Sequence, residues 1–225
     1  MKLAVLFSGG KDSCLALHKA IQEGHEIKYL LNIVPKDFDS FMFHKPYLNL
    51  LESQARELGI KLILQESKGE KEEELEDLIR LIKKVQKEVE GIVIGGIASN
   101  YQGDRLKKIC EDLGLKLVAP LWCYSSEKLW KELIEFGFKV IITKVSCEGL
   151  DKEWLGKIIT SEEFEKLRKL AEKYKFRLDF EGGEAETSVL FMPEFKNEIK
   201  ISFDSKKDIQ SEGKYRHFLK EIIMK

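Results

Sequence analysis

The sequence predicts an α/β protein: a parallel five-stranded sheet flanked by helices, followed by a smaller α+β C-terminal domain. Two observations support this fold class. Through the first 120 residues, short apolar segments of β character alternate with segments of helical periodicity, which is typical of βαβ units with right-handed crossovers. After Pro120-Leu-Trp122 the character of the sequence changes. We therefore expect two domains, at residues 1–121 and 122–225.

The five expected strands are short apolar runs bounded by turn residues. They lie at residues 2–7, 27–34, 61–65, 91–96 and 115–119. Between them, apolar residues recur at helical spacing, which predicts helices at residues 12–23, 46–58, 70–90 and 105–113. Three of these helices are followed by a glycine in the position where glycine commonly ends a helix: Gly24, Gly59 and Gly114.

The expected C-terminal domain mixes helices with strands. Thr160 and Glu163 form a capping box, which predicts a helix that runs to Tyr174. The other elements expected here are a helix at residues 126–136, a strand at 139–143, short strands near 188–191 and 198–203, and a terminal stretch at 215–224.

Composition favours a packed core beneath a heavily charged surface. Hydrophobic residues make up 43% of the chain and charged residues 34%. Lys and Arg number 38 against 39 Asp and Glu, which argues against a protein whose whole surface follows nucleic acid, although a local basic patch is compatible with it. No apolar run is long enough to span a membrane and no signal peptide is recognised, so we expect a soluble, cytoplasmic protein.

The four cysteines, Cys14, Cys110, Cys123 and Cys147, include no C-x-x-C pair. Their spacing supports neither a zinc nor an iron–sulfur site, and disulfides are rare in the cytoplasm. We expect four unbridged thiols that are buried or half-buried.

The hexapeptide Ser8-Gly-Gly-Lys-Asp-Ser13 joins the first expected strand to the first expected helix. Its adjacent glycines let the backbone approach a ligand, and the amides and dipole at a helix start favour an anion. Lys11 adds a positive charge, and Ser8 and Ser13 add hydroxyl donors, so the pattern predicts phosphate binding. It is not a Walker A loop, because Val5 stands where that motif has its first glycine. The alternative is a glycine-containing turn with a chance lysine.

Two other segments should lie near this loop, because a parallel sheet binds ligands beyond the carboxyl ends of its strands. One is the loop after Val34, where Met42 and His44 lie in a run of apolar and aromatic residues. That run either contacts a ligand or folds back as a lid over the core. His44 is either a base or a structural hydrogen-bonding residue.

The other segment spans residues 95–104. Gly95 and Gly96 would let the chain pass close to a base. Asp104 and Arg105 either begin a helix or point into the cleft, with Arg105 directed towards an anion or carboxylate.

The string Glu181-Gly-Gly-Glu-Ala-Glu-Thr187 combines a permissive turn with two nearby carboxylates. Glu184 and Glu186 are two residues apart, so on a strand they would face the same side. Such a pair suits Mg²⁺, an ammonium or a quaternary amine. The alternative is an ordinary acidic hairpin.

The hexapeptide resembles the pyrophosphate loop (PP-loop) of the ATP pyrophosphatase superfamily, whose pattern it matches at all six positions. This resemblance implies a Rossmann-like (HUP-type) fold and an enzyme that releases pyrophosphate from ATP while transferring AMP to an acceptor.

A narrower resemblance rests on strings that follow one another along the chain. They are the hexapeptide, Ser40-Phe-Met-Phe-His44, Gly95-Gly-Ile-Ala-Ser-Asn-Tyr-Gln102, Pro120-Leu-Trp122, Gly149-Leu-Asp151 and Glu181-Gly-Gly-Glu-Ala-Glu-Thr187. Together they resemble the diphthine–ammonia ligase family, N-type ATP pyrophosphatases that complete diphthamide on elongation factor 2. Relatives often carry an aromatic residue where this chain has Ala185.

The resemblance implies ATP and Mg²⁺ as cofactors, and elongation factor 2 bearing diphthine as the protein substrate. The nucleotide would be bound by Ser8, Gly9, Gly10, Lys11, Asp12, Ser13, Asn32, Ile33, Gly95 and Gly96. The catalytic set would be Lys11, Asp12, Glu184 and Glu186. The substrate set would be Met42, His44, Tyr101, Asp104, Arg105, Trp122, Gly182, Gly183, Glu184 and Thr187, with Tyr124 beside Trp122 as a second aromatic face.

Two other interpretations stay open, the first within the same superfamily and the second of a different functional class. One is a tRNA-modifying enzyme, although thiolation usually relies on paired cysteines and the chain has none. Another is a non-catalytic adenine-nucleotide sensor. No glutaminase-like extension is present, so free ammonium is the expected nitrogen source. Neither direct nucleic-acid binding nor a membrane partner is expected, and the oligomeric state, including a homodimer, is left open.

Overall fold

The computed structural model describes residues 1–35, 47–67, 71–96 and 100–224 of the chain. The chain forms two compact units. The first contains Met1–Ser8 and Asp12–Cys123, and the second contains Gly9–Lys11 and Tyr124–Lys225. The middle of the predicted phosphate loop therefore belongs with the C-terminal residues.

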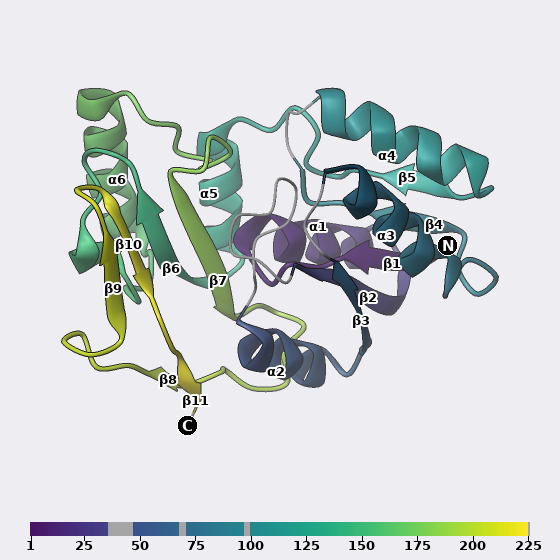
Figure 1. The fold of residues 1–225 in the computed structure, drawn as a ribbon, viewed down its shortest axis with the longest axis horizontal. Coiled ribbons are helices and arrows are strands. Elements are labelled where there is room, and N and C mark those ends of the chain that lie inside the picture. The colour runs from purple at the N-terminus through teal and green to yellow at the C-terminus, as the bar shows by residue number, and fades with distance from the viewer. Residues whose placement is uncertain (36–46, 68–70, 97–99, 225) are drawn as a thin grey trace. The chain divides into compact units, whose positions relative to one another are not determined.

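The first unit is built on a five-stranded parallel sheet in the order β3-β2-β1-β4-β5, which confirms the predicted α/β class (Figure 1). The strands are β1 (Lys2–Leu6), β2 (Glu26–Pro35), β3 (Lys61–Ser67), β4 (Gly91–Val93) and β5 (Lys116–Val118). The chain moves outward from β1 through β2 and β3, then returns to place β4 on the other side of β1. The carboxyl ends of β1 and β4 therefore form the switch point, where such sheets bind ligands.

Four helices cover the two faces of this sheet. They are α1 (Lys11–Gln22), α2 (Leu48–Leu58), α3 (Lys71–Lys83) and α4 (Asn100–Asp112). Because parallel crossovers are right-handed, α1 and α2 lie on one face, and α3 and α4 lie on the other. The core on the second face confirms this for α3 and α4: it joins Leu81 and Ile82 of α3 to Ile109 of α4, beneath Ile33 and Ile92 of the sheet.

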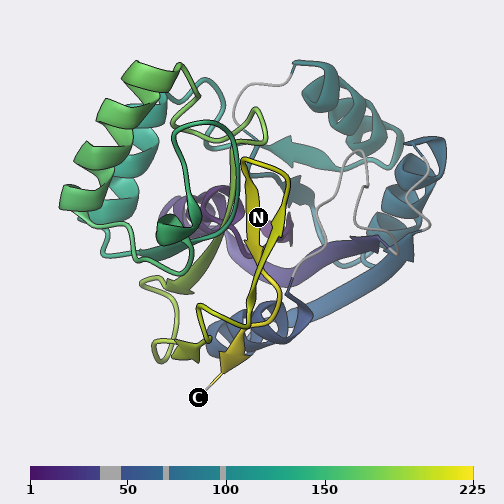
Figure 2. The same cartoon turned by 60° about the vertical axis from the view of Figure 1, so that its left-hand side comes forward.

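The second unit contains a four-stranded antiparallel sheet in the order β7-β6-β10-β9 and a separate two-stranded ribbon of β8 and β11. The yellow hairpin in Figure 2 is β9 and β10. The strands are β6 (Lys139–Ser146), β7 (Ala185–Phe191), β8 (Ile201–Ser202), β9 (Ile209–Glu212), β10 (Arg216–Leu219) and β11 (Ile223–Met224). The helices are α5 (Ser126–Glu135), the 3₁₀ turn η1 (Lys152–Trp154) and α6 (Ser161–Tyr174).

The two larger helices of this unit begin at side-chain caps. The Ser125 hydroxyl accepts from the Lys128 N–H at the start of α5. Thr160 accepts from the Glu163 N–H at the start of α6, which confirms the predicted N-cap, while the Glu163 carboxylate accepts from the Thr160 hydroxyl and not from its main-chain N–H as in a full capping box. Buried Trp130 of α5 packs against Phe164 of α6, with ring centroids 5.9 Å apart.

Several predicted boundaries were wrong. Helix α4 begins at Asn100 and not at residue 105, so Asp104 and Arg105 lie inside the helix and do not begin it. Strand β7 begins three residues earlier than the predicted strand at residue 188. Strands β9 and β10 lie where a turn and an unassigned terminal stretch were expected, because the residues there lack the apolar alternation that marks a strand. Among the helices in the described ranges, none has both the length and the hydropathy required to cross a membrane.

The α3 core generates a first prediction. Leu81→Ala should lower the free energy of unfolding by about 2–5 kcal/mol, because a fully buried leucine is replaced by a cavity. The matched control is Lys83→Ala two residues away on the exposed side of α3, where a change within about 0.5 kcal/mol is expected. Urea unfolding followed by circular dichroism measures both. Equal unfolding midpoints for the two variants would contradict the assigned core.

Candidate functional site

The loop between β1 and α1 is closed by two serine hydroxyls. The Ser8 and Ser13 hydroxyl oxygens lie 3.1 Å apart, and the Ser8 N–H donates to the Ser13 oxygen at 3.3 Å. These contacts wrap the loop around the first turn of α1. The first amides of a helix have no acceptor within the helix, so this turn favours a bound anion. Phosphate binding by this loop stays a prediction, and the closed loop at the helix start is compatible with it.

Gly9 gives the loop its sharp turn. Its φ of +74° lies in the left-handed region, where a side chain would be strained. Its carbonyl oxygen accepts a hydrogen bond from the Val189 N–H of β7 at 3.0 Å. The turn is thus held by a strand that lies 180 residues later in the sequence, and no pattern in the loop itself indicated that contact.

Lys11 is the most enclosed charged residue of the loop, with 3% of its surface exposed. Its ammonium donates to the main-chain carbonyl oxygen of Asp179 at 2.6 Å and lies 5.5 Å from the centroid of the Phe180 ring. Its backbone N–H donates to the Thr187 hydroxyl at 3.2 Å. The structure therefore brings together Lys11 and Thr187, which were predicted as nucleotide and substrate residues. It adds Asp179 and Phe180, which sequence reasoning missed.

Gly95, beyond β4, packs directly on the first turn of α1. A Cβ atom at this position would lie 2.6 Å from the Asp12 carbonyl carbon and 2.6 Å from the Ser13 nitrogen. Both neighbours are main-chain atoms, so they cannot move aside as a flexible side chain could. Gly96, in contrast, has open space around its position. The switch point thus needs a glycine at Gly95 for packing, independent of any ligand.

Asn32 and Ile33 lie near the carboxyl end of β2 and have different surroundings. The Asn32 amide donates to the Phe7 carbonyl oxygen at 2.7 Å and so fixes the end of β1 next to the loop. The other amide atom of Asn32, Oδ1, is buried and has no hydrogen-bond partner among the residues that the structure describes. The Ile33 side chain packs into the core beneath α3 and α4. Any contact of Ile33 with a nucleotide would therefore be made by its main chain.

The acidic string after Asp179 forms a turn that leads into β7. Glu184 lies before the strand, which begins at Ala185, so the expectation that Glu184 shares a strand face with Glu186 does not apply. The Glu184 carboxylate accepts the Arg177 N–H at 3.1 Å and the Gly182 N–H at 2.9 Å. A Cβ atom at Gly182 would lie 2.5 Å from that carboxylate. Glu184 therefore closes the turn.

The structure also describes the conformation of Gly183 and the contact of Glu186 in this string. Gly183 has a φ of +84°, which accounts for a glycine in the turn. The Glu186 carboxylate is 2.7 Å from the ammonium of Lys144 on β6, and both side chains are partly buried. A cation that binds Glu186 would thus share it with Lys144.

Trp122 is one of the few exposed large hydrophobic residues, at 39%. Its ring lies over Gly103 of α4, where a Cβ atom would approach the ring to 2.8 Å. Asp104 is exposed and Arg105 is partly buried on the same helix. Met42 and His44 lie outside the described residues, as does the side chain of Tyr101.

Two of the four cysteine thiols, those of Cys110 and Cys147, are unsuited to nucleophilic chemistry. All four lie in the described ranges and none is bridged to another, as predicted, but Cys123 is exposed and not buried or half-buried. Burial, with a smaller contribution from Glu184, raises the pKa of Cys147 to about 11. Burial likewise raises the pKa of Cys110 to about 11. Both thiols therefore stay protonated at neutral pH.

The described residues were compared with the ligand sets that bind metal ions in proteins. Within the ranges that the structure describes, no cluster of three or more His, Cys, Asp or Glu side chains could hold a metal ion. Mg²⁺ is commonly held by one or two carboxylates together with substrate phosphates. Asp12, in the first turn of α1, is the carboxylate beside the predicted phosphate position. Asp12 thus fits the role of a ligand to a Mg²⁺ ion that arrives with a nucleotide.

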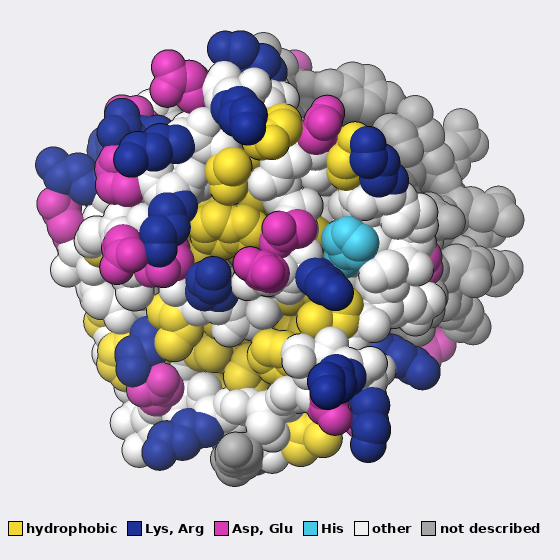
Figure 3. Space-filling view, turned by 90° about the vertical axis from the view of Figure 1, so that its left-hand side faces the viewer, with side chains coloured by type: hydrophobic (Ala, Val, Ile, Leu, Met, Phe, Trp, Pro, Cys, Tyr) yellow, Lys and Arg dark blue, Asp and Glu magenta, His cyan; other side chains and the backbone are white. Residues whose placement is uncertain are grey.

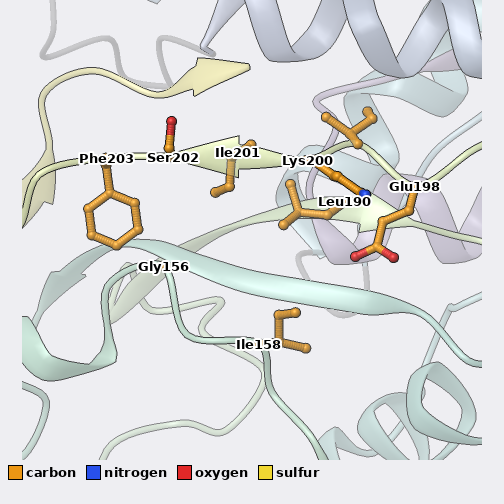
Figure 4. Close-up of a pocket in the computed structure, with 9 residues that line it drawn as sticks. Gly156, Ile158, Leu190, Glu198, Lys200, Ile201, Ser202 and Phe203 are labelled. Atoms are coloured by element: carbon orange, nitrogen blue, oxygen red, sulfur yellow. The ribbon is translucent and has the colours of Figure 1, made fainter. Parts of the chain in front are cut away.

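The second unit also carries an open groove of about 580 Å³ (Figure 4). Its lining residues are Gly156, Ile158, Leu190, Glu198, Ile199, Lys200, Ile201, Ser202 and Phe203. Apolar side chains make up much of the lining, and Glu198 is paired with Lys139 at 2.5 Å. None of the predicted site residues that the structure describes lines this groove.

Two family sequence models match the chain. The model described as the diphthamide synthase N-terminal domain matches residues 1–117. The model described as the diphthamide synthase C-terminal domain matches residues 125–222. The two matches together span both units.

Named relatives agree with these matches. The diphthine–ammonia ligase of Mus musculus is 34% identical over 223 residues, which cover 89% of this chain and 83% of that protein. The protein of the same name from Danio rerio is 35% identical over 222 residues, covering 89% of this chain and 86% of its own length. The one from Schizosaccharomyces pombe is 35% identical over 220 residues, covering 90% of this chain and 36% of its own length.

A solved structure described as a predicted subunit of tRNA methyltransferase from Methanocaldococcus jannaschii aligns with 86% of this chain and 98% of its own. The identity is 16% and the TM-score is 0.45. A likeness at this level supports no conclusion about function.

The glycines after β4 provide a matched pair of variants. Gly95→Ala should weaken ATP binding by about tenfold or more, because its Cβ would displace the main chain that begins α1. Gly96→Ala places a methyl group in open space and should change ATP affinity by about twofold or less. Calorimetric titration with ATP measures both. Equal effects of the two variants would show that close packing at Gly95 does not shape the nucleotide site.

Proposed function

The chain belongs to the diphthamide synthase family, and on that premise we propose that it catalyses the ATP-dependent amidation of diphthine on elongation factor 2 to diphthamide. The observation that carries the proposal is the match of both family domains, together with relatives named diphthine–ammonia ligase over 89% of the chain. We assign ATP binding to residues 1–121 and protein-substrate binding mainly to residues 122–225.

The proposed reaction has two steps. A carboxylate oxygen of diphthine attacks the α-phosphorus of ATP, and the bond from that phosphorus to the bridging oxygen breaks, releasing pyrophosphate. Ammonia then attacks the acyl carbon, the bond from that carbon to the AMP oxygen breaks, and the nitrogen loses a proton to give the amide. The protein's task is to hold the reactants in line and to neutralise charge on the leaving group.

The residues of the α1 loop suit that task. The hydroxyls of Ser8 and Ser13, which lie together at the start of α1, would donate to phosphate oxygens when a nucleotide is bound. Lys11 supplies the positive charge that the departing pyrophosphate requires. Asn32, the main chain at Ile33 and Gly95 would border the adenosine. Asp12 would hold Mg²⁺ against the phosphates, and the ion would supply further neutralisation of their charge.

The trimethylammonium group of diphthine needs an electronegative or aromatic surface. Glu186 offers a carboxylate that is only partly enclosed by its pairing with Lys144. The exposed face of Trp122 offers cation–π attraction. Glu184 is less suited to direct contact, because both of its carboxylate oxygens already accept main-chain hydrogen bonds. We therefore assign recognition of the quaternary amine to Glu186 and Trp122, and the shape of the turn to Glu184, Gly182 and Gly183.

The partner and compartment follow from this proposal. Elongation factor 2 acts on cytoplasmic ribosomes, so the enzyme would act in the cytoplasm, with free ammonium as the nitrogen source. A tRNA acceptor is less well supported. On the face shown in Figure 3, basic and acidic side chains are interspersed around an apolar area, so this face offers no extended basic surface for RNA.

The decisive measurement is AMP formation from ATP, with Mg²⁺ and ammonium, in the presence and absence of elongation factor 2 that carries diphthine. We expect AMP and pyrophosphate only when the modified factor and ammonium are both present. The unmodified factor is the control. ATP binding without AMP under any of these conditions would favour a nucleotide sensor, and AMP formed with tRNA in place of the factor would overturn the protein substrate.

Lys11→Gln tests the role assigned to the loop. Loss of the ammonium should lower the rate of AMP formation by about 100-fold or more, because charge on the leaving pyrophosphate is no longer neutralised. The control is Lys107→Gln, an exposed lysine on α4, for which no change is expected. Steady-state assays of AMP release compare the two. Wild-type turnover by Lys11→Gln would remove this residue from the mechanism.

A further inference from the structure

The turn at residues 177–184 is held by side chains that bind its main chain. The indole N–H of Trp130 on α5 donates to the Leu178 carbonyl oxygen at 2.7 Å. The Glu184 carboxylate accepts the N–H groups of Arg177 and Gly182. The path of the turn is therefore fixed from both of its ends.

The Asp179 carboxylate holds the middle of the turn. Its side chain is 7% exposed and receives both Nε and Nη2 of Arg177 at 2.9 Å. It also accepts the Ser126 hydroxyl at 3.0 Å and the Glu181 N–H at 3.1 Å. Burial alone would raise the pKa of Asp179, but the hydrogen bonds from Arg177, Glu181 and Ser126 outweigh it and hold this pKa below its ordinary value. The carboxylate thus stays ionised at neutral pH.

The same residue presents its main-chain carbonyl oxygen to Lys11. That oxygen accepts from the lysine ammonium at 2.6 Å, and the Phe180 ring lies beside it. Phe180 has a φ of +62°, a conformation that a phenylalanine rarely adopts, and its ring packs against Trp130. A buried ammonium needs such an acceptor, because burying the charge without a hydrogen-bond partner would strongly destabilise the folded protein.

These contacts form one chain of interactions: Arg177 and Ser126 fix the Asp179 carboxylate, and the Asp179 carbonyl fixes the Lys11 ammonium. We propose that Asp179 is a positioning residue, whose ion-paired carboxylate holds the turn so that its carbonyl oxygen and the adjacent Phe180 ring place the Lys11 ammonium for the phosphates of ATP. The proposal rests on the ATP-binding part of the function proposed above and does not depend on the acceptor.

Helix α5 takes part in this arrangement through two residues four positions apart. Ser126 and Trp130 lie on the same face of the helix and contact the turn at Asp179 and Leu178. Ser126 lies in the first turn, where the helix dipole also favours the Asp179 carboxylate. The position of Lys11 therefore depends on side chains that no motif in its own loop predicts.

A double-mutant cycle separates positioning from general stabilisation of the turn. ATP affinity is measured by calorimetric titration for the wild-type protein, Asp179→Ala, Lys11→Gln and the double variant. We expect Asp179→Ala to weaken ATP binding by about tenfold when Lys11 is present, and by about twofold or less in the Lys11→Gln background. The same loss in both backgrounds would overturn the proposal, because the carboxylate would then act without Lys11.

Asp204→Ala is the matched control. Asp204 also closes a turn in the second unit by accepting a main-chain N–H, that of Lys206 at 2.9 Å, but its partners do not include Lys11. It should leave ATP affinity unchanged in both backgrounds. A loss equal to that of Asp179→Ala would show that disturbing any turn of this unit weakens binding, and would overturn the proposal.

Ser126→Ala and Arg177→Gln keep the experiment decisive if Asp179→Ala does not fold. Each removes one donor to the carboxylate and should weaken ATP binding in the same direction, by about two- to fivefold, again only when Lys11 is present. Absence of this dependence on Lys11 would overturn the proposal. If the wild-type protein binds ATP but forms no AMP, the ligase function fails while the cycle remains readable. If it binds no ATP, both fail.

Discussion

The buried ammonium of Lys11 is the group on which the candidate site depends. A charged group with 3% of its surface exposed has lost most of its contacts with water. Other groups of the protein must therefore replace those contacts. It does so with a carbonyl oxygen and an aromatic face from a turn more than 160 residues away in the sequence. That single requirement links the loop, the turn and the helix that braces the turn.

The carboxylates near this turn act on the protein's own groups before any ligand is considered. Asp179 is paired with Arg177, Glu184 closes on two main-chain amides, and Glu186 meets Lys144. The acidic string at residues 181–187, which resembles a cation site in the sequence, thus makes contacts within the protein, and those of Glu184 hold the backbone turn. The same residues serve folding and, as proposed, ligand binding. Coupling energies between pairs of substitutions distinguish these two roles, whereas the contacts alone do not.

The sequence was sufficient to predict the parts of the fold whose signal is local. Alternating apolar strands and periodic helices determine the five-stranded sheet, and the hexapeptide marks its switch point, because both depend on neighbouring residues. The contacts of Asp179 and Phe180 with Lys11 could not be predicted in this way. Every residue type has a main-chain carbonyl, so the sequence does not indicate which carbonyl accepts a hydrogen bond from the lysine. The early start of α4 was hidden by Gly103, which serves the close approach of Trp122 and not a helix end.

Cys123 gives the chain a chemical property unrelated to its proposed reaction. It is the exposed member of the four cysteines, while Cys14 and Cys110 are buried and Cys147 is partly enclosed. The raised pKa of Cys110 and Cys147, each about 11, further slows their reaction with electrophiles at neutral pH. The protein therefore carries a natural attachment point for a thiol-reactive fluorophore or spin label, at the last residue of the first unit and next to Tyr124, where the main part of the second begins.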